Sequence, residues 1–197
     1  QQPAIEYQQV EGVWENNINS AEAAAVVERV ITLLGADPAK QIGVVTFNSP
    51  QQNLILDLLE ERFEKEGLAL PPTLFVKNIE NVQGDEKDMI IFSVGYAPDK
   101  QKKKMNMQFG SLNMPGGENR LNVAVTRARE KIILICSIQP EQLHTEELKN
   151  EGPKLLKKYL EFAREVDQRR FIPTVYPNGK QQSTWYLNHQ IKNWGEE

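Results

Sequence analysis

Short apolar runs alternate with amphipathic stretches along most of the chain. The apolar runs are rich in β-branched residues and suit buried strands, whereas apolar residues spaced by three and four indicate helices. The expected extended segments are 5–14, 41–48, 71–79, 88–96 and 131–137. The expected helices are 20–34, one that begins at 49, 118–129, 140–148 and 152–168. Strands that alternate with helices predict an α/β fold with a mainly parallel sheet covered on both faces.

The helix boundaries carry signals of their own. Asn19 or Ser20 can cap the first helix, because a side-chain oxygen at this position accepts from a free backbone N–H group. Gly35 is expected to end that helix. Ser49 is expected to cap the second helix, with Pro50 in the first helical position.

The composition excludes several kinds of site. The chain has 197 residues with a formal net charge of −4, so any contact with nucleic acid has to be a local patch. The single cysteine, Cys136, lies in an apolar run and is expected to be a small buried hydrophobe. His144 and His189 are far apart, and no residues show the spacing of zinc ligands. No metal site is therefore predicted.

The N-terminal stretch "QQPAIEYQQV" lacks the charged-then-apolar pattern of a signal peptide. No apolar run reaches the roughly 18 residues of a membrane span. A lone cysteine suits a reducing compartment. We therefore expect a cytoplasmic protein without membrane contact. The chain starts without methionine, which suggests a part excised from a longer protein.

The segment 118–129 sets several arginines on a predicted helix. With 3.6 residues per turn, Leu121 and its apolar neighbours form a buried stripe. Arg120 and Arg127 fall on one flank of that stripe, and Arg129 falls on the other. Such arginines can cover apolar neighbours and pair with surface carboxylates. They can equally form an anion site, because the planar guanidinium matches phosphate oxygens. The segment alone leaves both interpretations open.

The stretch "NVQGDEKD" (81–88) places a polar turn directly before a predicted buried strand. Gly84 permits a positive φ or the close approach of a ligand to the backbone. The carboxylates of Asp85, Glu86 and Asp88 do not match the magnesium-binding carboxylates of phosphate-hydrolysing enzymes. Those carboxylates follow an apolar strand, whereas this cluster precedes one. The phosphate loop G-x-x-x-x-G-K-[ST] is absent. If the protein handles a nucleoside triphosphate, most of the binding machinery lies on another segment.

Three segments are specific when taken together. They are "IGVVTFNSPQQ" (42–52), "NVQGDEKDMIIFS" (81–93) and "RLNVAVTRARE" (120–130). In this order they resemble motifs IV, V and VI of superfamily 1 helicases of the Upf1-like branch, in particular bacterial multidomain members. The resemblance implies a three-layer αβα RecA-like domain over 1–167, the second lobe of the motor, and an appendage or linker over 168–197.

The resemblance also implies a mechanism. In such helicases two RecA-like lobes clamp ATP between them, and the first lobe brings the phosphate loop and the magnesium carboxylates. Arg127 matches the arginine that reaches the γ-phosphate, and Arg120 matches the first arginine of motif VI, in a supporting role. Gly84 matches the glycine near the γ-phosphate, and Glu86 matches the glutamate near the ribose. The implied cofactor is ATP with magnesium, both bound mainly by the first lobe.

Other matched positions concern the nucleotide pocket and the nucleic acid. Gln51 matches a glutamine near the nucleotide pocket, and Gln83 lies where the nucleotide and the bound strand are coupled. Asn78 and Asn81 are candidates for contacts to single-stranded DNA or RNA. The implied partners are therefore a single nucleic-acid strand and the first RecA-like lobe. The lysines of 100–104 could grip phosphates or form a solvated loop.

Two departures from the family pattern keep alternatives open. Gln52 stands where many relatives carry an arginine, and Asn48 replaces a common aromatic residue. A RecA-like interaction module that has lost the chemistry is therefore a second interpretation. A dinucleotide-binding domain is disfavoured, because no G-x-G-x-x-G follows the first strand. Trp185 and Trp194 could stack on bases, although packing on a domain is the simpler role.

Overall fold

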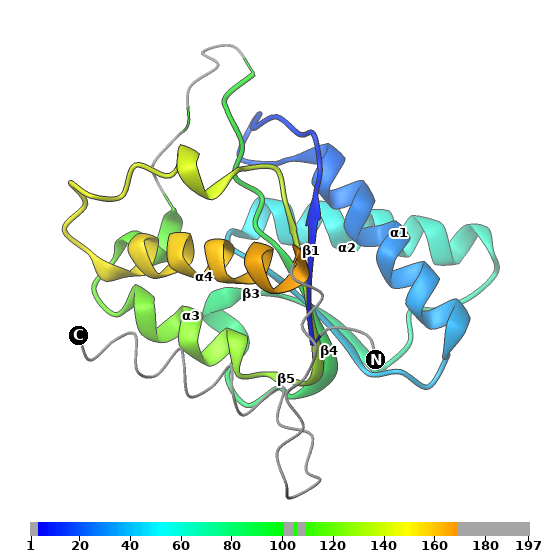
Figure 1. Ribbon diagram of the computed structural model, residues 1–197. Coiled ribbons are helices and arrows are strands. Elements are labelled where there is room, and N and C mark those ends of the chain that lie inside the picture. The colour runs from blue at the N-terminus through cyan, green and yellow to red at the C-terminus, as the bar shows by residue number, and fades with distance from the viewer. Residues whose placement is uncertain (1–3, 101–104, 106–108, 169–197) are drawn as a thin grey trace, which may run out of the picture.

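The computed structural model describes residues 4–100, 105 and 109–168 (Figure 1). The strands are β1 (Ile5–Gln9), β2 (Ile42–Thr46), β3 (Leu74–Asn78), β4 (Lys87–Ser93) and β5 (Ala128–Cys136). The helices are α1 (Ser20–Ala36), α2 (Ser49–Lys65), α3 (Gly117–Val125) and α4 (Glu151–Gln168). The short 3₁₀ turns are η1 (Ile79–Asn81), η2 (Gly110–Asn113) and η3 (Pro140–Gln142).

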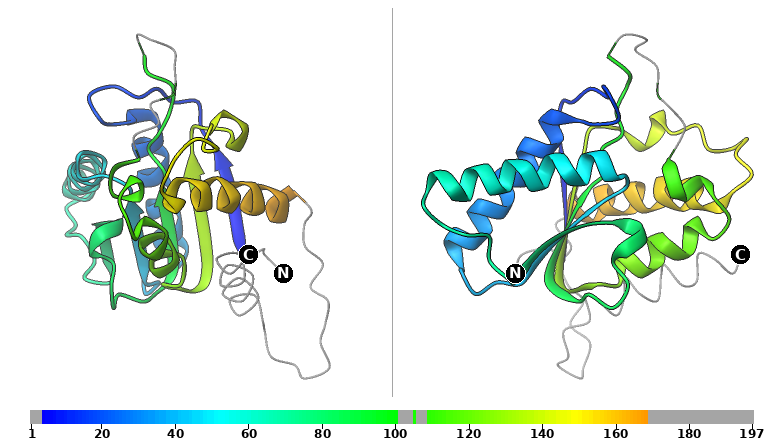
Figure 2. Two further views of the ribbon diagram at one scale, coloured as in Figure 1. Left: turned by 90° about the vertical axis from the view of Figure 1, so that its left-hand side faces the viewer. Right: turned by 180° about the vertical axis from the view of Figure 1, so that it is seen from behind.

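The sheet has the strand order β1-β5-β4-β2-β3 and is parallel throughout. From β1 the chain moves to β2 and β3, and it then reverses through β4 to β5. Because crossovers between parallel strands are right-handed, this reversal moves the connecting elements to the other face of the sheet. Helices α1 and α2 therefore cover one face, and α3 and α4 cover the other (Figures 1 and 2). The predicted three-layer α/β fold is confirmed.

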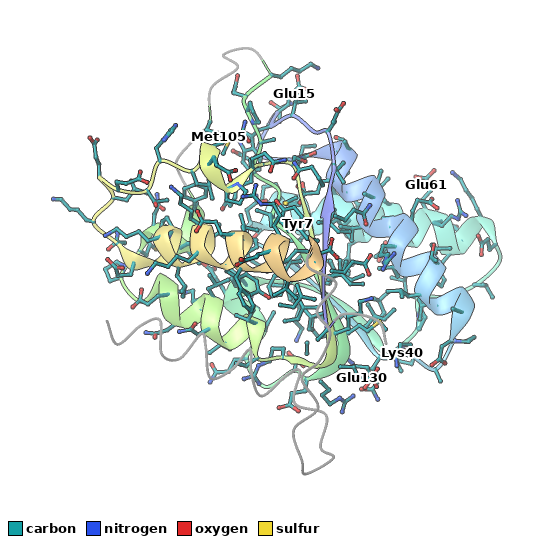
Figure 3. All side chains as sticks on the ribbon, in the orientation of Figure 1. Tyr7, Glu15, Lys40, Glu61, Met105 and Glu130 are labelled. Atoms are coloured by element: carbon teal, nitrogen blue, oxygen red, sulfur yellow. The ribbon has the colours of Figure 1, made fainter. Side chains whose placement is uncertain are left out.

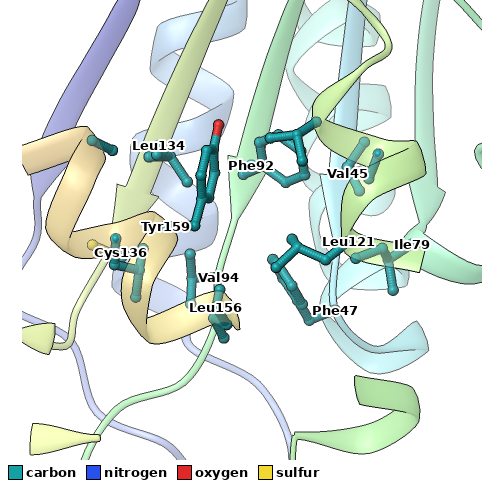
Figure 4. Close-up of a cluster of buried hydrophobic side chains, with 14 of the residues drawn as sticks. Val45, Phe47, Ile79, Phe92, Val94, Leu121, Leu134, Cys136, Leu156 and Tyr159 are labelled. Atoms are coloured by element: carbon teal, nitrogen blue, oxygen red, sulfur yellow. The ribbon is translucent and has the colours of Figure 1, made fainter. Parts of the chain in front are cut away.

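Each face of the sheet has its own apolar core. On the α3 and α4 side, Phe92 packs against Tyr159 with ring centroids 6.4 Å apart, and Leu121 joins the same cluster (Figure 4). On the α1 and α2 side, Ile91 and Ile133 pack against those helices. Neighbouring strand residues thus point into different cores. This explains why the central strands read as continuous apolar runs.

The strand ends define two edges of the sheet. At the carboxyl edge lie the ends of all five strands, and at the amino edge lie their starts. Figure 3 shows Glu15 near the carboxyl edge, and Lys40 and Glu130 near the amino edge, where the two side chains form a 2.6 Å ion pair. Between β3 and β4 the segment 79–86 runs from the carboxyl edge back to the amino edge. It crosses the face that α3 also covers.

Several predicted boundaries were wrong. The arginine-bearing helix ends at Val125 instead of 129, because Ala128 already pairs with Lys87 in the sheet. The predicted helix 140–148 is reduced to the turn η3. The first strand ends at Gln9, and the strand predicted over 88–96 ends at Ser93.

Two helix signals were also misassigned. Asn48, not Ser49, caps α2, since its side chain accepts from the backbone N–H of Gln51 at 2.8 Å. Asn19 caps α1 as expected, but α1 continues past Gly35 to Ala36.

Some predictions fall outside the described residues. The appendage over 168–197, with Trp185 and Trp194, lies outside them except for the last residue of α4. Of the lysines in 100–104, Lys100 is described, and it pairs with Glu15 at 2.9 Å. The lysine therefore serves an ion pair within the domain.

Candidate functional site

The turn 82–86 and the end of α3 meet at the amino edge. The backbone N–H of Lys87, at the start of β4, donates to the carbonyl of Arg127 at 3.0 Å. Arg127 precedes β5, whose first residue, Ala128, pairs with Lys87. The sheet thus places Arg127 beside the turn that carries Gly84, although the two residues are far apart in the sequence.

The turn presents three of its residues to solvent. Gln83, Gly84 and Glu86 are exposed, whereas Asp85 is held by Lys77, with 2.5 Å between the carboxylate and the ammonium nitrogen. Gly84 has a φ of 85°, and nothing lies within 4 Å of the position a Cβ would take. The glycine is therefore required by the backbone conformation, and open space beside it leaves the backbone accessible to a ligand.

The backbone at Gly84 gives a first testable prediction. Gly84→Ala is expected to lower the free energy of unfolding by about 1–2 kcal/mol, because a Cβ is strained at positive φ. Chemical denaturation of the 197-residue chain measures this change. Gly35→Ala is the matched control, since Gly35 lies inside α1 with nothing within 4 Å of a Cβ. That control should raise the free energy by about 0.5–1 kcal/mol. Equal effects of the same sign in both variants would contradict this account.

Arg127 is half-buried and lies just past the end of α3. Its Nε donates to the Val123 carbonyl at 2.9 Å, and its Nη2 donates to the Thr126 hydroxyl at 3.3 Å. Among the described residues, no carboxylate pairs with it, and its partners are groups at the end of its own helix. Two of the five N–H donors of a guanidinium are engaged. The other three have no partner within the described residues.

Arg129 has a different role from Arg127. It lies on β5, where its Nη2 donates to Asp88 at 2.8 Å and to Gln41 at 2.6 Å. Asp88 also accepts from the backbone N–H of Gln41 at 3.1 Å. Arg129 is therefore committed to the amino edge of the sheet, as the surface-pairing interpretation expects of such arginines.

Arg120 lies in the first turns of α3, at the other end of the helix from Arg127. It is half-buried, and its Nη1 donates to the Ser111 carbonyl at 3.4 Å. The predicted shared flank of Arg120 and Arg127 does not exist, because Arg127 lies outside the helix. Both guanidiniums nevertheless lack an acidic partner among the described residues.

The structure does not bring Gln51 to this site. Its side chain is fully buried at the carboxyl edge, at the start of α2. The amide oxygen accepts from the backbone N–H of Asn19 at 2.8 Å, and the amide nitrogen donates to Ser93 at 3.2 Å and to the Asn19 carbonyl at 3.1 Å. The amide is therefore saturated by contacts between α1, α2 and β4.

Glu22 forms the centre of the same buried network, and the sequence interpretation missed it. Oε1 accepts from Ser93 at 2.9 Å and from the Gly95 N–H at 2.5 Å, and Oε2 accepts from Ser137 at 3.2 Å. Burial raises the pKa of Glu22 from 4.5 to about 8, although these hydrogen bonds act in the opposite direction. The sequence contains a signal for this burial. Glu22 precedes Val26 and Val30 by one and two helical turns, so it lies on the apolar stripe of α1.

The candidate nucleic-acid residues lie near the carboxyl edge, where β3 ends. Asn78 is 6% exposed, and it accepts from the backbone N–H of Glu80 at 3.3 Å and donates to Ser49 at 3.2 Å. Asn78 therefore shapes the turn η1, whereas Asn81 at the end of η1 is exposed. Gln52 donates to the Val76 carbonyl at 3.1 Å, which ties it to the edge strand β3.

The structure also bears on metal binding and on membrane crossing. Within residues 4–100, 105 and 109–168, no group of three or more His, Cys, Asp or Glu side chains could hold a metal ion. No helix in the same part of the chain is long and apolar enough to cross a membrane.

Comparison with known proteins adds independent evidence. The family described as "AAA domain" matches residues 3–139, more than half of the chain. The chain is 40% identical over 161 residues to an uncharacterized ATP-dependent helicase of Mycoplasma genitalium, covering 77% of this chain and 14% of that protein. It is 35% identical over 121 residues to Regulator of nonsense transcripts 1 of Dictyostelium discoideum, covering 60% of this chain and 8% of that protein. It is 28% identical over 161 residues to DNA polymerase alpha-associated DNA helicase A of Saccharomyces cerevisiae, covering 81% of this chain and 20% of that protein.

Proposed function

Because the chain belongs to the AAA-domain family of superfamily 1, Upf1-like helicases, we propose that it is the second RecA-like lobe of an ATP-dependent helicase or translocase. The chain spans about a seventh or less of the first relatives it matches, so the motor would be a longer protein. In that motor this lobe supplies Arg127 and the Gly84 turn to an ATP site shared with a first lobe.

One observation carries the proposal. The amino edge of the sheet joins an exposed turn of open backbone to a guanidinium with no carboxylate partner among the described residues. A half-buried arginine that has no carboxylate partner in the described part of the chain, and that lies beside an accessible glycine, can bind an incoming phosphate. This arrangement supports Arg127 and Gly84 as the γ-phosphate side of the nucleotide site, and exposed Glu86 as the residue that reaches the ribose.

The chemistry of the site follows from phosphoryl transfer. Charge spreads over the oxygens of the transferred group in the transition state, and a fixed arginine stabilises it by position and charge. The Arg127 guanidinium is steadied by the Val123 carbonyl at 2.9 Å, so little reorganisation is needed when the phosphate arrives. Arg120 acts in support from the other end of α3.

The remaining parts of the ATP site are assigned to the first lobe. The chain carries no phosphate loop, and its described residues hold no cluster of metal ligands. The triphosphate and magnesium are therefore bound mainly by a first lobe that brings the phosphate loop and the carboxylates. When bound, magnesium neutralises the phosphate oxygens, and this lobe adds the arginine.

For the nucleic acid, we assign the carboxyl edge at the end of β3. Asn81 is exposed there and can contact the backbone of single-stranded DNA or RNA, while Asn78 holds η1 in shape. Gln83 lies on the segment 79–86 that runs from this edge to the Gly84 turn. This position supports a role for Gln83 in coupling the bound strand to the nucleotide.

A non-catalytic RecA-like interaction module is the second candidate function. It is favoured by Gln52, which stands where many relatives carry an arginine and which is tied to the Val76 carbonyl. A second γ-phosphate arginine is then missing from α2. The two candidates differ in one measurable respect, because only the motor lobe requires Arg127 for ATP turnover.

The proposal is tested by comparing the chain alone with the longer protein. The 197-residue chain is expected to show no ATP hydrolysis above background and to bind ATP weakly, because half of the site is absent from it. The longer protein is expected to hydrolyse ATP when DNA or RNA strands, assayed side by side, are added. A sub-micromolar ATP affinity of the chain alone would contradict the two-lobe site, and a longer protein inactive with both strands would contradict the motor.

A further inference from the structure

The backbone of the turn η2 lies in close contact with the starts of α3 and α4. A Cβ on Gly117, at the start of α3, would overlap the carbonyl oxygen of Leu112, and so would a Cβ on Gly152, at the start of α4. The Cβ on Gly152 would also lie 3.2 Å from the carbonyl carbon of Gly117. Only residues without side chains allow η2, α3 and α4 to approach this closely.

Three consecutive carbonyls of η2 are in contact with its neighbours. The Ser111 carbonyl accepts from Arg120 at 3.4 Å, and the Leu112 carbonyl faces the two glycines. The Asn113 carbonyl accepts from the side-chain amide of Asn150, the residue before α4. The start of α4 and the Arg120 guanidinium are therefore attached to the same four-residue turn.

The turn is a rigid support for these contacts. Leu112 is fully buried, and so is Phe109, whose ring meets Tyr96 edge-on with centroids 4.8 Å apart. Because η2 is packed in the core, no loose loop is present to absorb a displacement of the start of α4. Such a displacement is transmitted through η2 to the carbonyl that accepts from Arg120. The α4 side in turn is fixed by Tyr159 and Leu160, which are buried against the sheet.

We propose that Asn150 and Gly152 are positioning residues for Arg120 and that they act through η2. The inference rests on the proposed function, in which Arg120 supports Arg127 at the nucleotide. Neither residue needs to touch ATP. Asn150 fixes the η2 carbonyls by its hydrogen bond, and Gly152 permits the close contact that lets α4 hold η2 against α3.

The variant that tests this is Asn150→Asp, because it keeps the size of the side chain and removes the donor. In the longer protein it is expected to lower kcat for ATP by about three- to tenfold with KM changed less than about twofold, the scale of one lost hydrogen bond. Lys154→Ala is the matched control, since Lys154 lies on the same helix and pairs with Glu151 at 2.9 Å, its one ion-pair partner among the described residues. Gly152→Ala is less informative, because it can unfold the chain.

A double-mutant cycle separates positioning from general stability. In an Arg120→Ala background, Asn150→Asp is expected to have no further effect on kcat, because its route to the site has been removed. If Asn150→Asp lowered kcat by the same factor in the Arg120→Ala background as in wild type, the inference would be overturned. A wild-type kcat for Asn150→Asp in an active motor would also overturn it, a result that leaves the proposed function intact.

A readout on the chain itself keeps the inference testable if the longer protein has no ATPase activity. By NMR, Asn150→Asp is expected to shift the side-chain Nε–H signal of Arg120 and to speed its exchange with solvent. The signal of Arg129, which is bound to Asp88, should not move. An unchanged Arg120 signal would overturn the inference whatever the fate of the motor.

Discussion

Replacing Arg127 with alanine in the longer protein is expected to lower ATP turnover by at least about 100-fold. Loss of one fixed donor to a developing charge costs catalysis on this scale. The KM for ATP should change far less, because the first lobe holds most of the triphosphate. Nucleic-acid-stimulated ATP hydrolysis, measured at saturating ATP and saturating strand, gives the comparison.

Arg129→Ala is the matched control for this experiment. It removes the same side chain two residues away, but Arg129 is bound to Asp88 and Gln41 and lies outside the Gly84 turn. Its loss is expected to leave turnover within a few-fold of wild type. Wild-type turnover in Arg127→Ala would remove the motor assignment of this arginine and favour the interaction module. Equal losses in both variants would point to a general effect of positive charge at the amino edge.

The second large effect concerns Glu22 and the pH dependence of folding. Burial raises the pKa of this carboxyl to about 8, so between about 4.5 and about 8 the folded chain keeps a proton that the unfolded chain releases. The folded chain then binds more protons than the unfolded one, and its stability falls as the pH rises through this window. One such group changes the free energy of unfolding by up to about 1.4 kcal/mol per pH unit.

Glu22→Gln isolates this contribution, because glutamine does not titrate. Chemical denaturation of the 197-residue chain at intervals from pH 5 to pH 8 should show a smaller loss of stability in Glu22→Gln than in wild type. Glu28→Gln, on the exposed side of the same helix, should keep the wild-type slope. If the free energy of unfolding changed with pH equally in wild type and in Glu22→Gln, the buried carboxyl would not hold its proton.

The network around Glu22 gives this prediction a structural meaning. The network connects the starts of α1 and α2 to the ends of β4 and β5. Ser93 and Ser137 donate to the Glu22 carboxyl, while Gln51 donates to Ser93 and Asn19 donates to Ser137. In many α/β domains an anion can occupy the start of a helix at the carboxyl edge of the sheet. Here an internal carboxylic acid occupies the first turn of α1. The carboxyl edge beside α1 therefore serves to connect the helices to the sheet.

The alternation of apolar runs and amphipathic stretches by itself determined the α/β fold, because burial on both faces of a sheet leaves a continuous apolar run in each central strand. The order of the three segments 42–52, 81–93 and 120–130 likewise indicated the family, and two of them contain the residues of the candidate site. The tertiary structure alone decided that Arg127 leaves its helix, because the pairing of Ala128 with Lys87 overrides helical periodicity. It also decided that Gln51 and Glu22 are buried together, and that Gly117 and Gly152 meet at Leu112. Such contacts join residues distant in the chain, and no local pattern of side chains records which of them will meet.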